Sequence, residues 1–158
     1  MKYILKFSIA AVVFTAFTAT ALATPEANSP KPAHEGPSVS IPAAKIVFNG
    51  SGLKTSAGEV FVGQGYGNFS TGRHGTFMRL PSGFVTPNHT HTEDYYAVVL
   101  KGIVVNTQTG GKEIHMPVGS YFFQRGEEDH VTKCVSKTDC LLFNVQLDKF
   151  DFIPSKKD

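Results

Sequence analysis

The sequence predicts an all-β protein built around one small barrel or sandwich. Short β-prone runs recur along its central part, separated by clusters of glycine, proline, asparagine and serine. No segment shows the apolar period of a helix of ordinary length. Many short strands at this spacing are typical of a sandwich or barrel. The expected strands are residues 45–48, 59–62, 75–80, 95–100, 103–106, 120–124, 130–135 and 141–147.

The chain begins with the pattern of a secretory signal peptide. Lys2 and Lys6 precede an uncharged apolar run at 7–22, which ends in the small-x-small pattern of Ala21 and Ala23. A membrane anchor is the alternative, but spanning a bilayer takes about 20 consecutive apolar residues, and threonines interrupt this shorter run. We therefore expect residues 1–23 to be removed, and the mature protein to be secreted or periplasmic without a stable membrane anchor.

Composition divides the rest of the chain into three parts. Residues 24–43 contain five prolines and few large apolar side chains, which predicts a flexible segment. Residues 44–153 suit one domain with its own core, and residues 154–158 form a short polar tail. The chain carries 15 Lys and Arg against 13 Asp and Glu; cleavage would remove two lysines and leave 13 against 13. This balance disfavours a nucleic-acid-binding surface.

The two cysteines, Cys134 and Cys140, predict a disulfide, because a close pair in an exported chain is usually oxidised. A tight hairpin over 135–139 would place them opposite one another at a separation that a disulfide tolerates. A metal or redox role for the thiols is the alternative. The simplest hairpin register turns Cys140, Leu142, Asn144 and Gln146 toward the face of His130, whereas a β-bulge would reverse it; the sequence leaves both open.

Three histidines form the candidate metal site. His89 and His91 are two residues apart, so on a strand both side chains leave the same face. His130 opens a later β-prone run, and an antiparallel fold can bring the strand ends together. Neutral imidazole is a good ligand for borderline divalent metals, so we expect His89, His91 and His130 to hold one ion.

These residues resemble the two sequence motifs of the cupin superfamily. Gly83, five residues, His89-Thr-His91 and then Gly102 is similar to the first motif, and Gly119, five residues, Arg125 and then His130 is similar to the second. Within cupins the pattern is most similar to an uncharacterised, DUF4437-like branch. The resemblance implies a single jelly-roll β-barrel with a metal ion inside it.

The chain departs from the cupin pattern at four positions. Tyr95 stands where the family's acidic ligand is expected, Arg125 where proline is usual, Glu127 where glycine is usual, and Cys134 where asparagine is usual. The fold tolerates these changes, since a barrel depends on pattern and turns, but the family's three-His, one-Glu ligand set is not preserved. The site is either a three-histidine centre or one completed by Glu93 or Tyr95.

Neighbouring polar residues have two interpretations each. Tyr95 either packs its ring in the barrel or directs its hydroxyl at the metal-bound ligand as the catalytic proton carrier. Glu93 is expected to be a solvated turn residue. Arg125 either pairs with the acidic turn at 127–129 or reaches an anionic substrate. His74 and His115 have no partner at ligand spacing and are expected to be ordinary surface or strand residues.

The sequence therefore predicts a cupin with one divalent metal, acting on or binding a small-molecule ligand or substrate. Zinc and iron are favoured, and manganese, nickel and copper are compatible. An oxygenase-like, hydrolase-like or isomerase-like enzyme and a non-catalytic binding or sensory domain need the same metal ligands, and fold alone does not separate them. A homodimer is also compatible with the pattern.

Overall fold

The computed structural model describes residues 37–156. The predicted signal peptide, most of the proline-rich segment and His34 lie outside these residues. No helix in the described part is long and apolar enough to cross a membrane. The only helix there is the single 3-10 turn η1, Ala43–Lys45.

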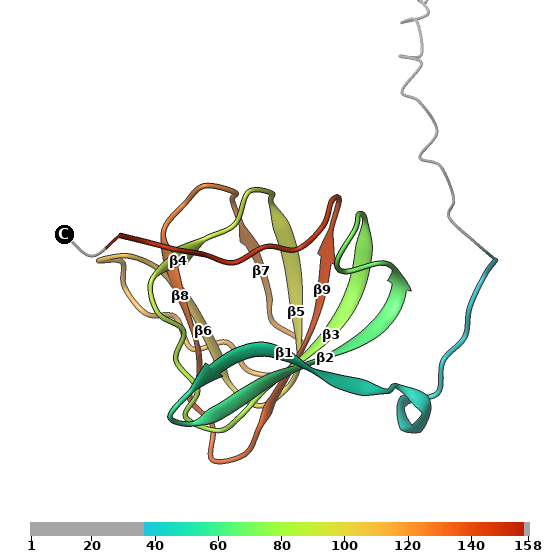
Figure 1. Ribbon diagram of the computed structural model, residues 1–158. Helices are drawn as coiled ribbons and strands as arrows, with labels where there is room; N and C mark the ends of the chain where they lie inside the picture. The colour runs from blue at the N-terminus through green and yellow to red at the C-terminus, as the bar shows by residue number, and fades with distance from the viewer. Residues whose placement is uncertain (1–36, 157–158) are drawn as a thin grey trace, which may run out of the picture. The chain divides into compact units, whose positions relative to one another are not determined.

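Two antiparallel sheets face each other and enclose the core, which confirms the predicted all-β jelly-roll barrel (Figure 1). The six-stranded sheet has the order β1-β2-β3-β9-β5-β7, and the four-stranded sheet has the order β10-β4-β8-β6. The strands are β1 Phe48–Thr55, β2 Gly58–Gly67, β3 His74–Leu80, β4 His89–Thr90, β5 Tyr95–Lys101, β6 Val104–Gln108, β7 Tyr121–Gln124, β8 His130–Cys134, β9 Cys140–Gln146 and β10 Ile153–Pro154.

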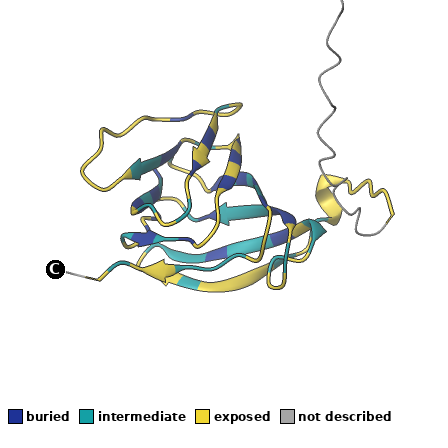
Figure 2. Ribbon diagram, turned by 90° about the horizontal axis from the view of Figure 1, so that it is seen from above, coloured by how far each residue is buried: buried dark blue, intermediate teal, exposed yellow. Residues whose placement is uncertain are grey.

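Alternation along β9 determines which side chains enter the barrel. Cys140, Leu142, Asn144 and Gln146 are buried, while the residues between them are only partly covered. Successive strand side chains point to opposite faces, so one face of β9 lines the interior. Of the two orientations left open above, the one that turns Asn144 and Gln146 inward is therefore correct. The same alternation recurs in β5 and β8 and concentrates burial between the sheets (Figure 2).

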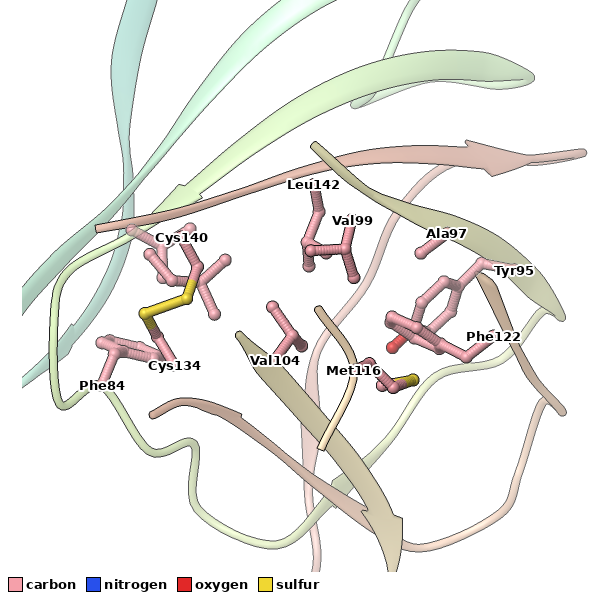
Figure 3. Close-up of a cluster of buried hydrophobic side chains, with 12 residues drawn as sticks. Phe84, Tyr95, Ala97, Val99, Val104, Met116, Phe122, Cys134, Cys140 and Leu142 are labelled. Atoms are coloured by element: carbon pink, nitrogen blue, oxygen red, sulfur yellow. A yellow bond between two sulfur atoms is a disulfide. The ribbon is translucent and has the colours of Figure 1, made fainter. Parts of the chain in front are cut away.

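The apolar core lies between the two sheets and reaches the disulfide. Phe84, Val99, Val104 and Leu142 are at most 3% exposed and belong to the same buried cluster as the two cysteines (Figure 3). Gly102 turns the chain from β5 to β6 at φ 82°, and a Cβ there would lie 2.8 Å from the sulfur of Cys140. Glycine is needed at this position for both its left-handed backbone and its lack of a side chain.

The Cys134–Cys140 disulfide is present, but the predicted hairpin around it is wrong. Its Cα atoms are 5.7 Å apart. Cys134 ends β8 in the four-stranded sheet, whereas Cys140 begins β9 in the six-stranded sheet. β8 pairs with β6 and β4, and β9 pairs with β3 and β5. The disulfide therefore joins the two sheets instead of bridging neighbouring strands of one.

The first expected strand is also displaced. Residues 43–45 form η1, and β1 begins at Phe48 and runs to Thr55, through residues that lie between the first two expected strands. A register shift between Gly50 and Lys54 interrupts the pairing of β1 with β2. Most β1 residues are exposed, so pairing with β2, and not apolar patterning, defines this edge strand. β2 likewise extends to Gly67, beyond the expected end at 62.

Candidate metal centre

Two strands of the four-stranded sheet bring the histidines together. His89 begins β4, His130 begins β8, and the two residues are directly paired across these strands. His91 follows β4, on the same side as His89. All three rings are at most 3% exposed, and one ring nitrogen from each lies within 4.8 Å of the others. In the described residues this is the one cluster of His, Cys, Asp or Glu side chains with such spacing.

Main-chain carbonyls orient each ring. Nδ1 of His89 donates to Pro87 O at 2.9 Å, Nδ1 of His130 donates to Glu128 O at 2.9 Å, and Nδ1 of His91 donates to Asp151 O. A carbonyl oxygen can only accept, so Nδ1 carries the proton and Nε2 has the free lone pair. A hydrogen bond from the ring nitrogen that does not bind the metal is typical of metal-ligating histidines.

The buried nitrogen of His130 fits a cation. Its Nε2 is fully buried and has no hydrogen-bond partner among the described residues. A buried polar atom of this kind is costly unless something satisfies it. A metal ion bound between the three rings would satisfy it, so the donor set fits a divalent ion.

Burial keeps the three imidazoles neutral. Desolvation is the main cause that lowers the pKa of His89 to about 3 and that of His91 to about 4, and it also lowers the pKa of His130. Repulsion from a protonated His130 would lower the pKa of both other rings further. At neutral pH the site therefore presents unprotonated nitrogens, the form that binds metal.

A C-terminal segment that the sequence analysis missed covers the site. It crosses from the end of β9 to β4, where β10 pairs with His89 and Thr90 (Figure 1). Phe152 stacks on the ring of His89 with centroids 4.2 Å apart, and Phe150 lies 4.9 Å from the ring of His91. The spacing of these two phenylalanines around Asp151 was the available signal, since alternate residues of an extended segment share a face.

Asp151 connects this segment to the histidine loop. Its carboxylate accepts hydrogen bonds from the main-chain nitrogen of Thr92 at 2.9 Å and from the Thr92 hydroxyl, while its carbonyl accepts from His91. Residues 154 and 155, within the expected polar tail, also hold the segment in place: Pro154 pairs with His89, and Ser155 N donates to Asn88 O at 3.0 Å.

Tyr95 lies beside the histidines inside the barrel. Its ring contacts His91 edge-on, with centroids 5.2 Å apart, and its hydroxyl lies 3.5 Å from Asn106 Oδ1. Burial raises the pKa of the Tyr95 phenol, so the hydroxyl keeps its proton. The ring packs against the core, as one of the two interpretations expected, and the residue also lines the cavity next to the site.

The remaining polar candidates lie away from the histidines. Glu93 is exposed and is not part of the cluster, and Arg125 is exposed without an ion pair among the described residues. Glu127 has the left-handed φ of 60° at the position where cupins usually have glycine. His115 is exposed, whereas His74 is buried on β3 between Thr76 and Gln146.

Two adjoining cavities lie at the site. The inner one, of about 30 Å³, is lined by His89, His91 and Tyr95 together with apolar side chains. The outer one, of about 340 Å³, opens between β1 and the C-terminal segment. The wall between them is formed by the residues common to both linings, Leu53, Val60, Met78, Phe150 and Phe152.

Several solved structures share this fold. The polyketide cyclase RemF from Streptomyces resistomycificus is 13% identical, with a TM-score of 0.62 over 77% of this chain and 87% of that protein. A predicted oxalate decarboxylase from Thermotoga maritima is 20% identical, with a TM-score of 0.58 over 70% of this chain and 99% of that protein. An RmlC-like cupin from Ralstonia eutropha is 15% identical, with a TM-score of 0.58 over 77% of this chain and 76% of that protein.

No curated protein matches this sequence. The family described as "Domain of unknown function (DUF4437)" matches residues 55–157, a range that includes all three histidines and nearly the whole barrel. The chain belongs to the DUF4437 family, and its barrel has the fold of the cupin structures to which it is similar.

Proposed function

We propose that this protein is an exported cupin that binds a small molecule at a mononuclear metal centre. His89, His91 and His130 are the metal ligands, and three protein ligands leave a position open for water or a ligand. The observation that carries the proposal is the hydrogen bonding of the rings. All three Nδ1 protons are donated to main-chain carbonyls, which leaves each Nε2 lone pair free, and one nitrogen of each ring lies within 4.8 Å of the others.

The metal content of the mature protein tests this proposal. Protein purified without a histidine tag should contain about one zinc or iron ion per chain by elemental analysis, because a buried imidazole set of this kind suits these metals. Protein that stays metal-free after incubation with zinc, ferrous, manganese, nickel and copper ions in turn would contradict it.

A catalytic role is the second candidate, and Tyr95 favours it. Its phenol lines the inner cavity with His89 and His91, and burial keeps it protonated. The hydroxyl is therefore suited to donate a hydrogen bond to a molecule held on the ion. The ion, when bound, would supply Lewis-acid or redox chemistry.

Tyr95→Phe separates catalysis from binding. The exchange keeps the ring contact with His91 and removes only the hydroxyl. If Tyr95 carries a proton, turnover of an identified substrate should fall about 100-fold or more, whereas its binding changes little. A nearly silent exchange would leave Tyr95 a packing residue.

Export is supported by the cross-sheet disulfide, since such bonds persist in oxidising compartments. We expect the mature protein to begin at Thr24. The intact mass of protein recovered from an exporting cell tests this directly, and a mass that retains the first 23 residues would contradict it.

A homodimer is proposed from the outer face of β5 and β7. Tyr96 and Phe123 pack with ring centroids 5.2 Å apart on this face, and β7 is the last strand of its sheet. The exposed apolar residues there are Tyr96, Val98, Leu100, Tyr121 and Phe123. Light scattering should give twice the chain mass for the mature protein and the single-chain mass for Phe123→Glu; a monomeric wild type would contradict the proposal.

A further inference from the structure

The wall between the two cavities is apolar. Leu53, Val60 and Met78 form one side of it, and Phe150 and Phe152 form the other. Leu80, Phe84 and Leu142 extend the apolar lining of the inner cavity. A molecule that reaches the histidines from the outer cavity must therefore pass between apolar side chains.

The lining offers very little charge to a ligand. Apart from the histidines proposed as metal ligands, Tyr95 is the one ionisable side chain among the described residues that lines the inner cavity. The outer lining contains one, Asp151, whose carboxylate already accepts two hydrogen bonds from Thr92. A charged group on a ligand, other than the one bound to the metal, would be buried here without a partner of opposite charge, which is costly.

Polar contacts in the inner cavity come from neutral groups. Thr86, Thr132 and Asn144 line it with hydroxyl and amide groups. The Oδ1 atom of Asn144 is buried and has no hydrogen-bond partner among the described residues. It is available to accept a hydrogen bond from a bound molecule.

The proposed ion would provide the one strong charge of the site. Three neutral imidazoles do not neutralise a divalent cation, and the histidine cluster contains no carboxylate. A single anionic oxygen is therefore the preferred additional ligand. The inner cavity of about 30 Å³ has room for a donor atom, and the outer cavity of about 340 Å³ has room for the rest of a small molecule.

We infer that the ligand is a small molecule with a largely apolar body and one ionisable hydroxyl, such as a phenol or an enol. Its oxygen binds at the metal, and its body lies against Leu53, Met78, Phe150 and Phe152. The lining disfavours dicarboxylates and phosphorylated sugars, because their second charge would meet no cation. This inference rests on the proposed metal centre and adds the chemical class of its ligand.

Two phenols of similar size test the inference. The mature protein is loaded with cobalt(II), and its visible absorption is followed during titration with 4-methylphenol or with 4-hydroxybenzenesulfonate. The sulfonate makes its phenol the more acidic, which by itself favours metal binding. We nevertheless expect 4-methylphenol to bind about tenfold more tightly or better, because the sulfonate charge has no partner in the pocket.

Leu53→Lys adds the missing cation. Leu53 lies on the edge strand β1 and lines both cavities. The substitution should therefore strengthen binding of the sulfonate and reduce the preference for 4-methylphenol to within about threefold. Ile114→Lys is the matched control, since Ile114 is 67% exposed and lines neither cavity; it should keep the wild-type preference.

The outcomes distinguish a failure of the proposed metal centre from a failure of the proposed ligand class. Failure to take up cobalt counts against the metal centre itself. Cobalt uptake without 4-methylphenol binding, or with equal or tighter binding of the sulfonate, overturns the ligand class and leaves the metal centre standing. If Leu53→Lys does not fold, the wild-type comparison of the two phenols decides alone.

Discussion

The two ends of β8 lie in contrasting environments. At its first residue, the ring of His130 lies beside those of His89, His91 and Tyr95. At its last residue, Cys134 is joined to Cys140 and belongs to the apolar cluster (Figure 3). We call these regions the histidine end and the disulfide end of the barrel.

The contrast places the disulfide and the proposed metal site at opposite ends of the same strand. Buried apolar contacts and a covalent link hold the sheets together at the disulfide end. The histidine end buries polar rings that satisfy one another poorly, as the unpartnered Nε2 of His130 shows. Such a site can persist because the other end supplies the burial that keeps the barrel folded. Each substitution below changes residues at one end of the barrel, and its effect is followed as stability, metal affinity or both.

Phe84→Ala should have the largest effect on stability. Phe84 is fully buried, and its carbonyl accepts a 2.9 Å hydrogen bond from the nitrogen of Cys134. Truncating a buried phenylalanine costs about 3 to 5 kcal/mol of unfolding free energy, which denaturant titration measures. Metal affinity of the folded variant should stay within about threefold of wild type, because Phe84, although it lines the inner cavity, supplies no ligand. A larger loss of affinity would show that the two ends are coupled.

Removing the disulfide should have the next largest effect. Cys134→Ala with Cys140→Ala should lower the unfolding free energy by about 2 to 2.5 kcal/mol, the chain-entropy value for so short a loop. Thiol alkylation of the unreduced, denatured wild type should label neither cysteine. Wild-type labelling, or a double variant as stable as wild type, would contradict this account of the disulfide end.

Asp151→Ala addresses the histidine end without touching a ligand. The exchange removes both hydrogen bonds that Thr92 donates to the carboxylate. It keeps the main-chain carbonyl that accepts from His91 but holds it less firmly in place. Loss of such outer support typically weakens metal binding about 10-fold to 100-fold, which competition with a chelator measures. Asp148→Ala, nearby in an exposed position, is the control and should bind metal as wild type does. Equal affinities for the two variants would remove Asp151 from the metal site.

Glu127→Gly should have the smallest effect and the opposite sign. Glu127 adopts φ 60°, a conformation that costs a residue with a Cβ about 1 kcal/mol. Glycine relieves this cost, but its greater freedom in the unfolded chain offsets part of the benefit. We therefore expect the free energy of unfolding to rise by about 0.5 kcal/mol. Glu128→Gly, whose φ is not positive, should destabilise instead. A loss of stability in Glu127→Gly would assign the glutamate side chain a contact of its own.

The sequence predicted the residues that carry local signals. The His89–His91 spacing, the separation of the cysteines and the alternation along β9 each depend on a few neighbouring residues. They predicted the histidine cluster and the disulfide, and they left two faces of β9 as candidates for the barrel interior. The choice between the faces of β9 required its pairing with β3 and β5.

Long-range pairing accounts for what the sequence did not predict. The hairpin proposed for Cys134 and Cys140 assumed that strands adjacent in sequence are adjacent in space, whereas β8 and β9 belong to different sheets. β4 and β10 have two residues each, too few for any periodicity. The cover over the histidines, formed by Phe150 and Phe152, depends on that short pairing and so left only a weak local pattern.

Metal binding by His130→Ala tests the central claim most directly. Native mass spectrometry should show one ion on the wild type and on His115→Ala, the exposed-histidine control, but almost none on His130→Ala, because two imidazoles are too few to hold the ion firmly. Circular dichroism should show all three proteins folded, since the disulfide end is unchanged. A folded His130→Ala protein that keeps full metal occupancy would contradict the three-histidine centre.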